Sequence, residues 1–201
     1  MSTTNKIALV TGANRGLGRE CVRQLAAADF HVILTSRSAK GEAVAAEFRA
    51  AGLDVIYHQL DVADGQSIAE LSEFLHETYE CLDVLVNNAG IHYDTFQHTL
   101  NADFSIVEEA FRVNTLGPWR LSKALIPLLK ASEAGRIVNV SSGSGSFVDS
   151  WPGTPAYSMS KAALNMVTVK MAADLAETSV KANAVGPGWV RTDMGGQEAP
   201  R

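Results

Sequence analysis

The chain has 201 residues, of which 46% are hydrophobic and 19% are charged, a balance typical of one globular domain of ordinary size. Its formal net charge is −5 and it has no basic cluster, which argues against nucleic-acid and anionic-membrane partners. No apolar run approaches the roughly 20 residues that cross a bilayer, and the polar start Met1 to Lys6 does not read as a signal peptide. Cys21 and Cys81 form no metal-ligand motif. We therefore expect a cytoplasmic chain without a metal.

Short apolar runs alternate with helical patterns along the chain. Strands are predicted at Lys6–Val10, His31–Thr35, Asp54–His58, Leu82–Val86, Arg136–Val140 and Val180–Val185. Helices are predicted at about Leu17–Ala28, Lys40–Ala51, Gly65–Tyr79, Asp103–Asn114, Pro118–Ala131 and Pro155–Glu177. Pro127 is expected to kink or unwind the fifth of these helices near its end.

This strict alternation with short connections predicts an α/β fold, namely a single doubly wound, Rossmann-type parallel sheet with helices on both faces. The sequence contains no internal repeat, linker or low-complexity tract. We therefore expect residues 1–201 to form one domain.

A glycine-rich turn follows the first predicted strand. Thr11 to Gly18 reads T-G-A-N-R-G-L-G, so that glycines stand at positions 12, 16 and 18. Glycines between a strand and a helix let backbone N–H groups and the helix dipole approach a pyrophosphate, which favours nucleotide binding. A tight turn whose glycines serve packing alone is the alternative interpretation.

The end of the second predicted strand bears on the choice of nucleotide. Domains that bind NAD carry an acidic residue about 20 residues beyond the glycines, where it holds the ribose 2′-hydroxyl. Here that place reads Ser36-Arg37-Ser38, without an acid. Arg37, together with Arg15 of the glycine turn, could hold a 2′-phosphate by charge-assisted hydrogen bonds. The pattern favours NADP over NAD, and two ordinary surface arginines are the alternative.

Tyr157 and Lys161 lie four residues apart near the start of the last predicted helix, so they share one of its faces. A tyrosine phenol has a pKa of about 10 in its ordinary state. A nearby positive charge favours the phenolate and brings the pKa toward the range useful for acid–base catalysis. The pair follows a strand and a serine-glycine loop, at the sheet edge where open α/β sheets bind ligands.

Taken together and in this order, the motifs resemble those of the short-chain dehydrogenase/reductase family, and within it those of the NADPH-dependent carbonyl reductases. The matching pieces are Thr11–Gly18, Asp61-Val62, Asn87-Asn88-Ala89-Gly90, Asn114, Val140-Ser141-Ser142, Tyr157 with Lys161, and Pro187–Thr192. The resemblance covers nearly the whole chain. It implies an oxidoreductase that reduces an aldehyde or ketone to an alcohol by hydride transfer from NADPH.

The resemblance also implies four catalytic positions. Tyr157 would protonate the carbonyl oxygen, while Lys161 would lower the phenol pKa and hydrogen-bond the nicotinamide ribose. Ser142, the second of the serine pair, would hydrogen-bond the substrate carbonyl. Ser144 is the alternative serine, because the gap from Ser142 to Tyr157 is slightly longer than the family usually shows. Asn114 would hold a water that links Lys161 to solvent.

Cofactor contacts follow from the same resemblance. The implied positions are Gly12, Asn14, Arg15, Gly16, Leu17, Gly18, Arg37, Asp61, Val62, Asn88, Gly90, Tyr157, Lys161, Val190 and Thr192. Among these, Asp61 and Val62 would contact the adenine. Val190 and Thr192 would meet the carboxamide of the nicotinamide.

Relatives usually continue past the Pro-Gly segment through a covering helix, a further strand and a last helix. The sequence stops at Arg201, so we expect that cover to be truncated and the last predicted strand to be an exposed edge. A non-catalytic NADP-binding sensor or scaffold module is the alternative function. Relatives pair through helices matching Pro118–Ala131 and Pro155–Glu177 or are monomers, so a homo-oligomer and a monomer both remain open.

Overall fold

The computed structural model describes residues 6–91, 93–148 and 151–200. Its strands are β1 (Ile7–Val10), β2 (His31–Ser36), β3 (Val55–Gln59), β4 (Val84–Asn87), β5 (Arg136–Val140) and β6 (Lys181–Val185). They form one parallel sheet in the order β3-β2-β1-β4-β5-β6. The order reverses between β1 and β4, which is the switch point where doubly wound sheets bind their ligands. The predicted Rossmann-type sheet is confirmed.

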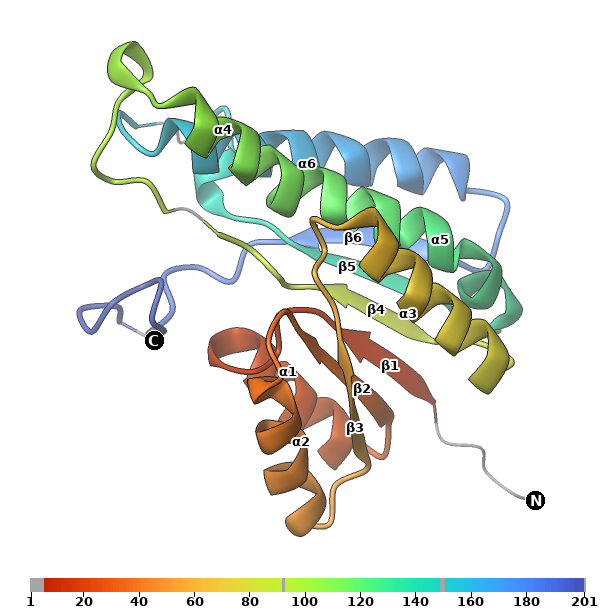
Figure 1. The fold of residues 1–201 in the computed structure, drawn as a ribbon. Coiled ribbons are helices and arrows are strands. Elements are labelled where there is room, and N and C mark those ends of the chain that lie inside the picture. The colour runs from red at the N-terminus through yellow and green to blue at the C-terminus, as the bar shows by residue number, and fades with distance from the viewer. Residues whose placement is uncertain (1–5, 92, 149–150, 201) are drawn as a thin grey trace.

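Helices cover both faces of this sheet. They are α1 (Gly16–Ala27), α2 (Lys40–Ala50), α3 (Gly65–Thr78), α4 (Phe104–Phe111), α5 (Gly117–Ala131) and α6 (Pro155–Asp174). Figure 1 shows α1 and α2 beside β1, β2 and β3, whereas α3, α5 and α6 lie across the opposite face. In the described residues no helix is both long enough and apolar enough to span a bilayer.

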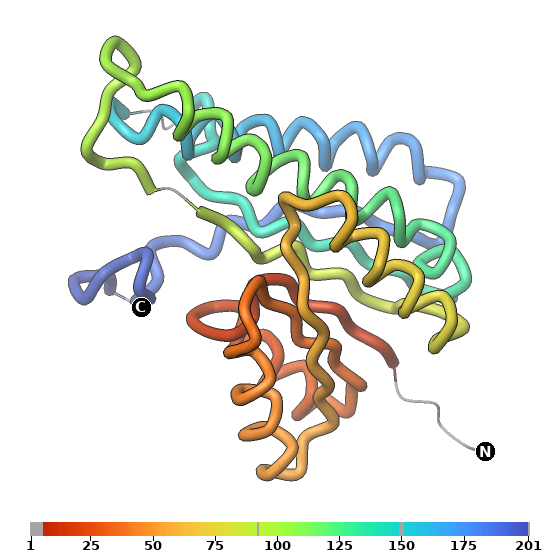
Figure 2. The backbone as a smooth tube through the Cα atoms, in the orientation of Figure 1, coloured from red at the N-terminus to blue at the C-terminus, as the bar shows by residue number. Residues whose placement is uncertain are grey.

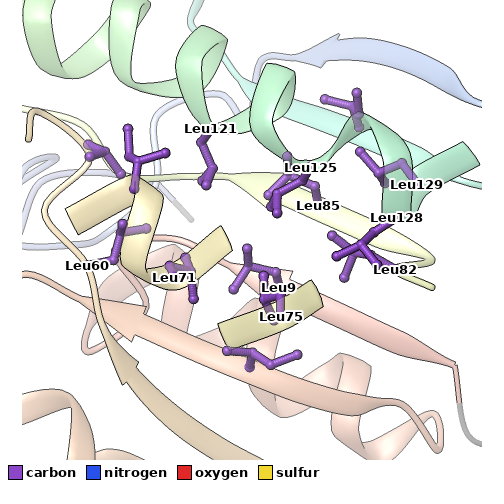
Figure 3. Close-up of a cluster of buried hydrophobic side chains, with 14 of the residues drawn as sticks. Leu9, Leu60, Leu71, Leu75, Leu82, Leu85, Leu121, Leu125, Leu128 and Leu129 are labelled. Atoms are coloured by element: carbon purple, nitrogen blue, oxygen red, sulfur yellow. The ribbon is translucent and has the colours of Figure 1, made fainter. Parts of the chain in front are cut away.

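Two hydrophobic cores result, one on each face, because successive strand residues point in opposite directions. Leu9 packs with leucines of α3 and α5, of which Leu71 and Leu125 are examples (Figure 3). Its neighbours Ala8 and Val10 pack in the second core with residues of α1 and α2. Strands that are covered on both faces need apolar residues at nearly every position, which explains the continuous apolar runs of the sequence.

The segment between α4 and α5 differs from the prediction of two separate helices. A π-helical turn at Arg112–Leu116 joins them into one continuous rod. Such turns are frequent at functional sites, and this one contains Asn114. The predicted unwinding at Pro127 is wrong, because α5 continues past it to Ala131. Pro127 is exposed, and the buried leucines that follow it keep the last turn packed on the sheet.

The chain after β6 takes no regular helix or strand through residue 200. The tube in Figure 2 shows this last segment leaving the sheet at the end of β6 and looping to one side of the strand ends. Within the described residues β6 is the edge strand, and Lys181, Asn183 and Val185 are exposed. The exposed edge agrees with the expectation from the sequence.

Candidate active site

A cleft of about 590 Å³ opens at the carboxyl ends of the strands. Of the residues predicted for the site it is lined by Gly12, Asn14, Arg15, Gly16, Leu17, Arg37, Asp61, Val62, Asn88, Gly90, Ser142, Ser144, Tyr157, Lys161, Val190 and Thr192. Gly18 and Asn114 do not line this cleft and support residues that do. Residues far apart in the sequence thus meet at the switch point, as the topology requires.

The glycine turn is pinned to the end of β4. Asn88 donates its side-chain amide to the carbonyls of Thr11 and Gly12, at 2.9 and 3.1 Å. Gly12 has φ +63°, and a β-carbon on it would lie 2.8 Å from Ala89 Cα. A β-carbon on Gly18 would collide with the Asn88 amide nitrogen. The glycines are therefore required by this close packing, and the backbone left bare at the cleft can approach a phosphate.

Two arginines line the cleft. Arg37 follows β2 and is exposed, and Arg15 is in the glycine turn. The Arg15 guanidinium donates to Asp193 at 2.7 Å, which ties the turn to the segment after β6. Both side chains of this ion pair are more than 70% exposed, so the pair is held in water. Both arginines expected to hold a 2′-phosphate thus line the cleft, and that role stays a prediction.

Tyr157 and Ser142 both line the cleft. Ser142 lies two residues beyond the end of β5, where it caps a short 3-10 turn, and its hydroxyl accepts from the Ser144 amide at 3.2 Å. Burial raises the pKa of the Tyr157 phenol, and the Ser142 hydroxyl partly opposes this rise. Of the two serines considered, Ser142 is the one that affects the pKa of the tyrosine.

Lys161 lies one helical turn farther along α6 and is 3% exposed. Its Nζ donates to the Val140 carbonyl at 2.7 Å and lies 5.6 Å from the centroid of the Tyr157 ring. Burial lowers the pKa of Lys161 to about 8. The expectation of a lowered phenol pKa is not met, because the burial of Tyr157 is the largest influence on its pKa and raises it.

Asn114 is fully buried in the π-helical turn, behind the cleft. Its amide nitrogen donates to the Ile91 carbonyl and to the Ser160 hydroxyl, both at 3.0 Å, and its oxygen accepts from the Ile91 amide at 2.9 Å. A β-carbon on Gly90 would lie 3.5 Å from Asn114 Oδ1 and 3.6 Å from Lys161 Nζ. The side chain therefore braces the loop after β4 and lies near the lysine.

Sequence reasoning missed the loop residues Tyr93 and Asp94. The Tyr93 ring meets the Tyr157 ring edge-on, with centroids 5.4 Å apart. The Asp94 carboxylate is fully buried and accepts from the backbone amides of Ala156 and Tyr157, both at 3.0 Å. No motif in the sequence signals these contacts, because they join residues 62 or more positions apart.

The cleft also suits a polar ligand. Ser141 is among the residues that line it, and its buried Oγ has no hydrogen-bond partner among the described residues. An unpaired buried hydroxyl is costly unless a ligand or water satisfies it. At the mouth the cleft is lined by Trp151, Trp189 and Met194, which provide apolar surface. In the described part of the chain, no group of three or more His, Cys, Asp or Glu residues is placed to hold a metal ion.

The sheet order and the cleft define a Rossmann-type α/β protein with its cleft at the switch point, where such sheets bind their ligands. The sequence model of the family described as short chain dehydrogenase matches residues 6–201. The chain belongs to this family, as the resemblance predicted.

Similar proteins agree with this placement. Carbonyl reductase [NADPH] 1 from Bos taurus is 36% identical, covering 100% of this chain and 87% of that protein. (+)-Neomenthol dehydrogenase from Arabidopsis thaliana is 34% identical over 95% of this chain and 85% of its own length. Among solved structures, NADPH-bound carbonyl reductase from chicken fatty liver has a TM-score of 0.84 and 32% identity. It is matched over 96% of this chain and 82% of that chain.

Proposed function

We propose that the chain reduces an aldehyde or ketone to an alcohol with NADPH, and catalyses the reverse oxidation, with Tyr157 as the general acid. One observation carries the proposal: Tyr157, Ser142 and Lys161 line the same cleft as the glycine turn, and Ser142 is close enough to Tyr157 to affect the pKa of its phenol. The two carbonyl reductases named above, both with NADPH in their descriptions, support the reaction and the cofactor.

NADP(H) is the cofactor. The glycine turn would hold its pyrophosphate, while Arg37 and Arg15 would hold the 2′-phosphate that distinguishes it from NAD. Asp61 and Val62 would flank the adenine. When bound, NADPH supplies the hydride that reduces the carbonyl carbon.

The proton moves through the chain's own residues. The Tyr157 hydroxyl would give its proton to the substrate oxygen as negative charge develops there, and Ser142 would donate a hydrogen bond to the same oxygen. Lys161, whose ammonium has a pKa of about 8, would stabilise the phenolate that remains and help to return a proton to it. Asn114 would hold the water that connects Lys161 to solvent.

The mouth of the cleft bears on the substrate. Trp151, Trp189 and Met194 line it together with Tyr93. Large apolar side chains with few polar groups favour an uncharged substrate with an apolar body. We therefore propose a neutral, apolar aldehyde or ketone as the substrate.

Cofactor binding is tested first, by titrating the tryptophan fluorescence with NADPH and, separately, with NADH. Two of the chain's three tryptophans line the cleft, so a bound nucleotide should change their emission. We expect NADPH to bind more tightly than NADH. Equal affinity for the two nucleotides would contradict the assignment of Arg37 and Arg15.

Turnover is then tested with a panel of neutral aldehydes and ketones. Tyr157→Phe should lower kcat by about 10²- to 10⁴-fold while the Kd for NADPH stays within about twofold, because only the proton donor is removed. Ser142→Ala should also reduce kcat, whereas its matched control Ser144→Ala should not. If the wild type binds NADPH but neither it nor Tyr157→Phe turns over any carbonyl, the non-catalytic module is the better reading.

A further inference from the structure

Helix α6 has no side chain of its own to cap its first turn. The residue before it, Thr154, lies in the left-handed region with φ 48°, and its hydroxyl pairs with that of Ser158 at 3.0 Å rather than with a backbone amide. Pro155, the first helical residue, has no N–H. The free amides of this turn are therefore those of Ala156 and Tyr157, which need an acceptor from elsewhere.

Asp94 supplies that acceptor from the loop after β4. Its Oδ2 accepts from the Ala156 amide and its Oδ1 from the Tyr157 amide, each at 3.0 Å. Gln97 donates its side-chain amide to Oδ2 at 2.8 Å and is itself fixed, because its oxygen accepts from the Asp103 amide at 2.9 Å. Burial alone would raise the pKa of Asp94, but these hydrogen bonds outweigh it and lower the pKa. The carboxylate therefore stays charged at the positive end of α6.

Tyr93, the residue before Asp94, contacts the side chain of Tyr157. The Tyr93 ring stands at 89° to the Tyr157 ring, with centroids 5.4 Å apart, in the edge-to-face arrangement that aromatic pairs prefer. Tyr93 also lines the cleft. Two consecutive loop residues thus hold the backbone and the ring of Tyr157.

We propose that Tyr93 and Asp94 are positioning residues for the general acid, an inference that rests on the proposed function of Tyr157. The first turn of a helix frays when its amides lack acceptors. Fraying of α6 would displace the Tyr157 hydroxyl from the substrate oxygen, and a misplacement of about 1 Å can cost about 10²-fold in rate. The loop after β4 therefore couples the substrate-binding wall to the placement of the proton donor.

The first test is Asp94→Asn. The asparagine side chain has the same shape, but an NH₂ group replaces one of the two oxygens that accept from the backbone amides of Ala156 and Tyr157. We expect kcat for carbonyl reduction to fall about 10- to 100-fold, with the Kd for NADPH unchanged within about twofold. The control is Asp103→Asn, a change of the same type at the carboxylate that caps α4 through the Ser105 amide. This control should leave kcat unchanged. Equal kcat for Asp94→Asn and wild type, measured well below the melting temperature of both, would overturn the proposal.

A second pair of variants avoids the buried carboxylate. Tyr93 is 42% exposed, so its substitution should leave the chain folded. We expect Tyr93→Ala to lower kcat several-fold and Tyr93→Phe, which keeps the ring against Tyr157, to restore it. If Tyr93→Phe is as impaired as Tyr93→Ala, the ring contact does not position the tyrosine.

A readout without turnover separates this proposal from the proposed function. The four tyrosines can be labelled with ¹³C at Cζ, and the Tyr157 signal identified by its loss in Tyr157→Phe. In Asp94→Asn a loosened first turn should expose the phenol, so its titration should begin at lower pH than in wild type. An unchanged titration contradicts the positioning role even if the wild type reduces no carbonyl. A shifted titration in a chain without turnover supports the positioning role and contradicts the proposed function.

Discussion

The two walls of the cleft are built differently. Tyr157 and Lys161 lie on one wall and Asn114 lies directly behind it; all three are less than a tenth exposed, and protein hydrogen bonds hold them. On the other wall the glycine turn meets the segment after β6 through Arg15 and Asp193, whose side chains are each more than 70% exposed. The groups proposed to move protons are therefore rigid before any ligand binds, whereas the groups proposed to hold the nucleotide phosphate lie in water.

This difference predicts how mutations on each wall should affect the stability of the protein and its affinity for the cofactor. Hydrogen bonds among buried groups are strong, and removing one partner leaves the other unsatisfied at a cost of about 1–3 kcal/mol. Exposed ion pairs contribute about 0–1 kcal/mol. Changes on the buried wall should therefore alter stability, and changes on the exposed wall should alter affinity for the cofactor alone.

The largest expected effect is that of Asn114→Ala on the buried wall. The change leaves the amide and carbonyl of Ile91 without their partner, and the Ser160 hydroxyl keeps only its bond to the Tyr157 carbonyl. We expect the free energy of unfolding, measured by urea denaturation, to fall by about 3 kcal/mol. Asn101→Ala, at an exposed asparagine that accepts from the His98 amide, is the control and should cost less than about 1 kcal/mol. Similar losses in both variants would contradict the strength assigned to the buried hydrogen bonds of Asn114.

Lys161→Met tests the cost of burying a charge on that wall. The folded chain releases the lysine proton near pH 8, whereas the unfolded chain holds it up to about 10.5. Because the unfolded state binds more protons in between, the wild type should gain about 3 kcal/mol of unfolding free energy relative to Lys161→Met from pH 8 to pH 10.5. Lys170→Met, at an exposed lysine of α6, should show no such trend. Parallel pH curves for wild type and Lys161→Met would contradict the buried charge.

Arg37→Ala tests the exposed wall. Losing charge-assisted bonds worth about 1.5–3 kcal/mol should raise the Kd for NADPH about 10- to 100-fold. The Kd for NADH and the unfolding free energy should hardly change. Arg49→Ala, an exposed arginine of α2 paired with Glu42, is the control and should affect neither nucleotide. A parallel loss of NADH affinity would mean that Arg37 does not read the 2′-phosphate.

Asp193→Ala should have the smallest effect. It removes the partner of Arg15 at the surface, so we expect the unfolding free energy to change by less than about 0.5 kcal/mol. The freed Arg15 should bind NADPH as well as in the wild type or about twofold better. A stability loss above about 1 kcal/mol would show that this ion pair fixes the segment after β6 more firmly than its exposure indicates.

Local patterns in the sequence predict the fold well, because both faces of every central strand are buried. Runs such as Arg136–Val140 coincide with the strand in the structure. The predicted start of β4 differs from the structure. Leu82 is apolar and buried, as a strand residue would be, but β4 begins only at Val84. The π-helical turn around Asn114 also escapes prediction, since it depends on contacts with α6 and with the loop after β4 rather than on its own residues.

The site residues that could be predicted are likewise those that belong to a local sequence pattern. The glycines of the turn and the Tyr157–Lys161 pair have a characteristic spacing along the chain. Asp94 belongs to no such pattern, because it caps α6 only when the fold brings it to the start of that helix. The pKa of Tyr157 likewise depends on burial, which the sequence does not reveal, and so its direction differed from the expectation.

The position of β1 beside β4 has a consequence for the order in which the chain can assemble during synthesis. β1 can pair with β2 as soon as α1 and β2 have been made, but its other neighbour arrives much later, as the bond from the Ile7 amide to Asp83, 76 residues on, illustrates. Contacts of such long separation form slowly. In a ribosome-bound chain that ends before β4, β1 would pair with β2 and pack against α1 and α2, but the edge of β1 that later pairs with β4 would have no partner. This intermediate would be the one in need of protection from aggregation.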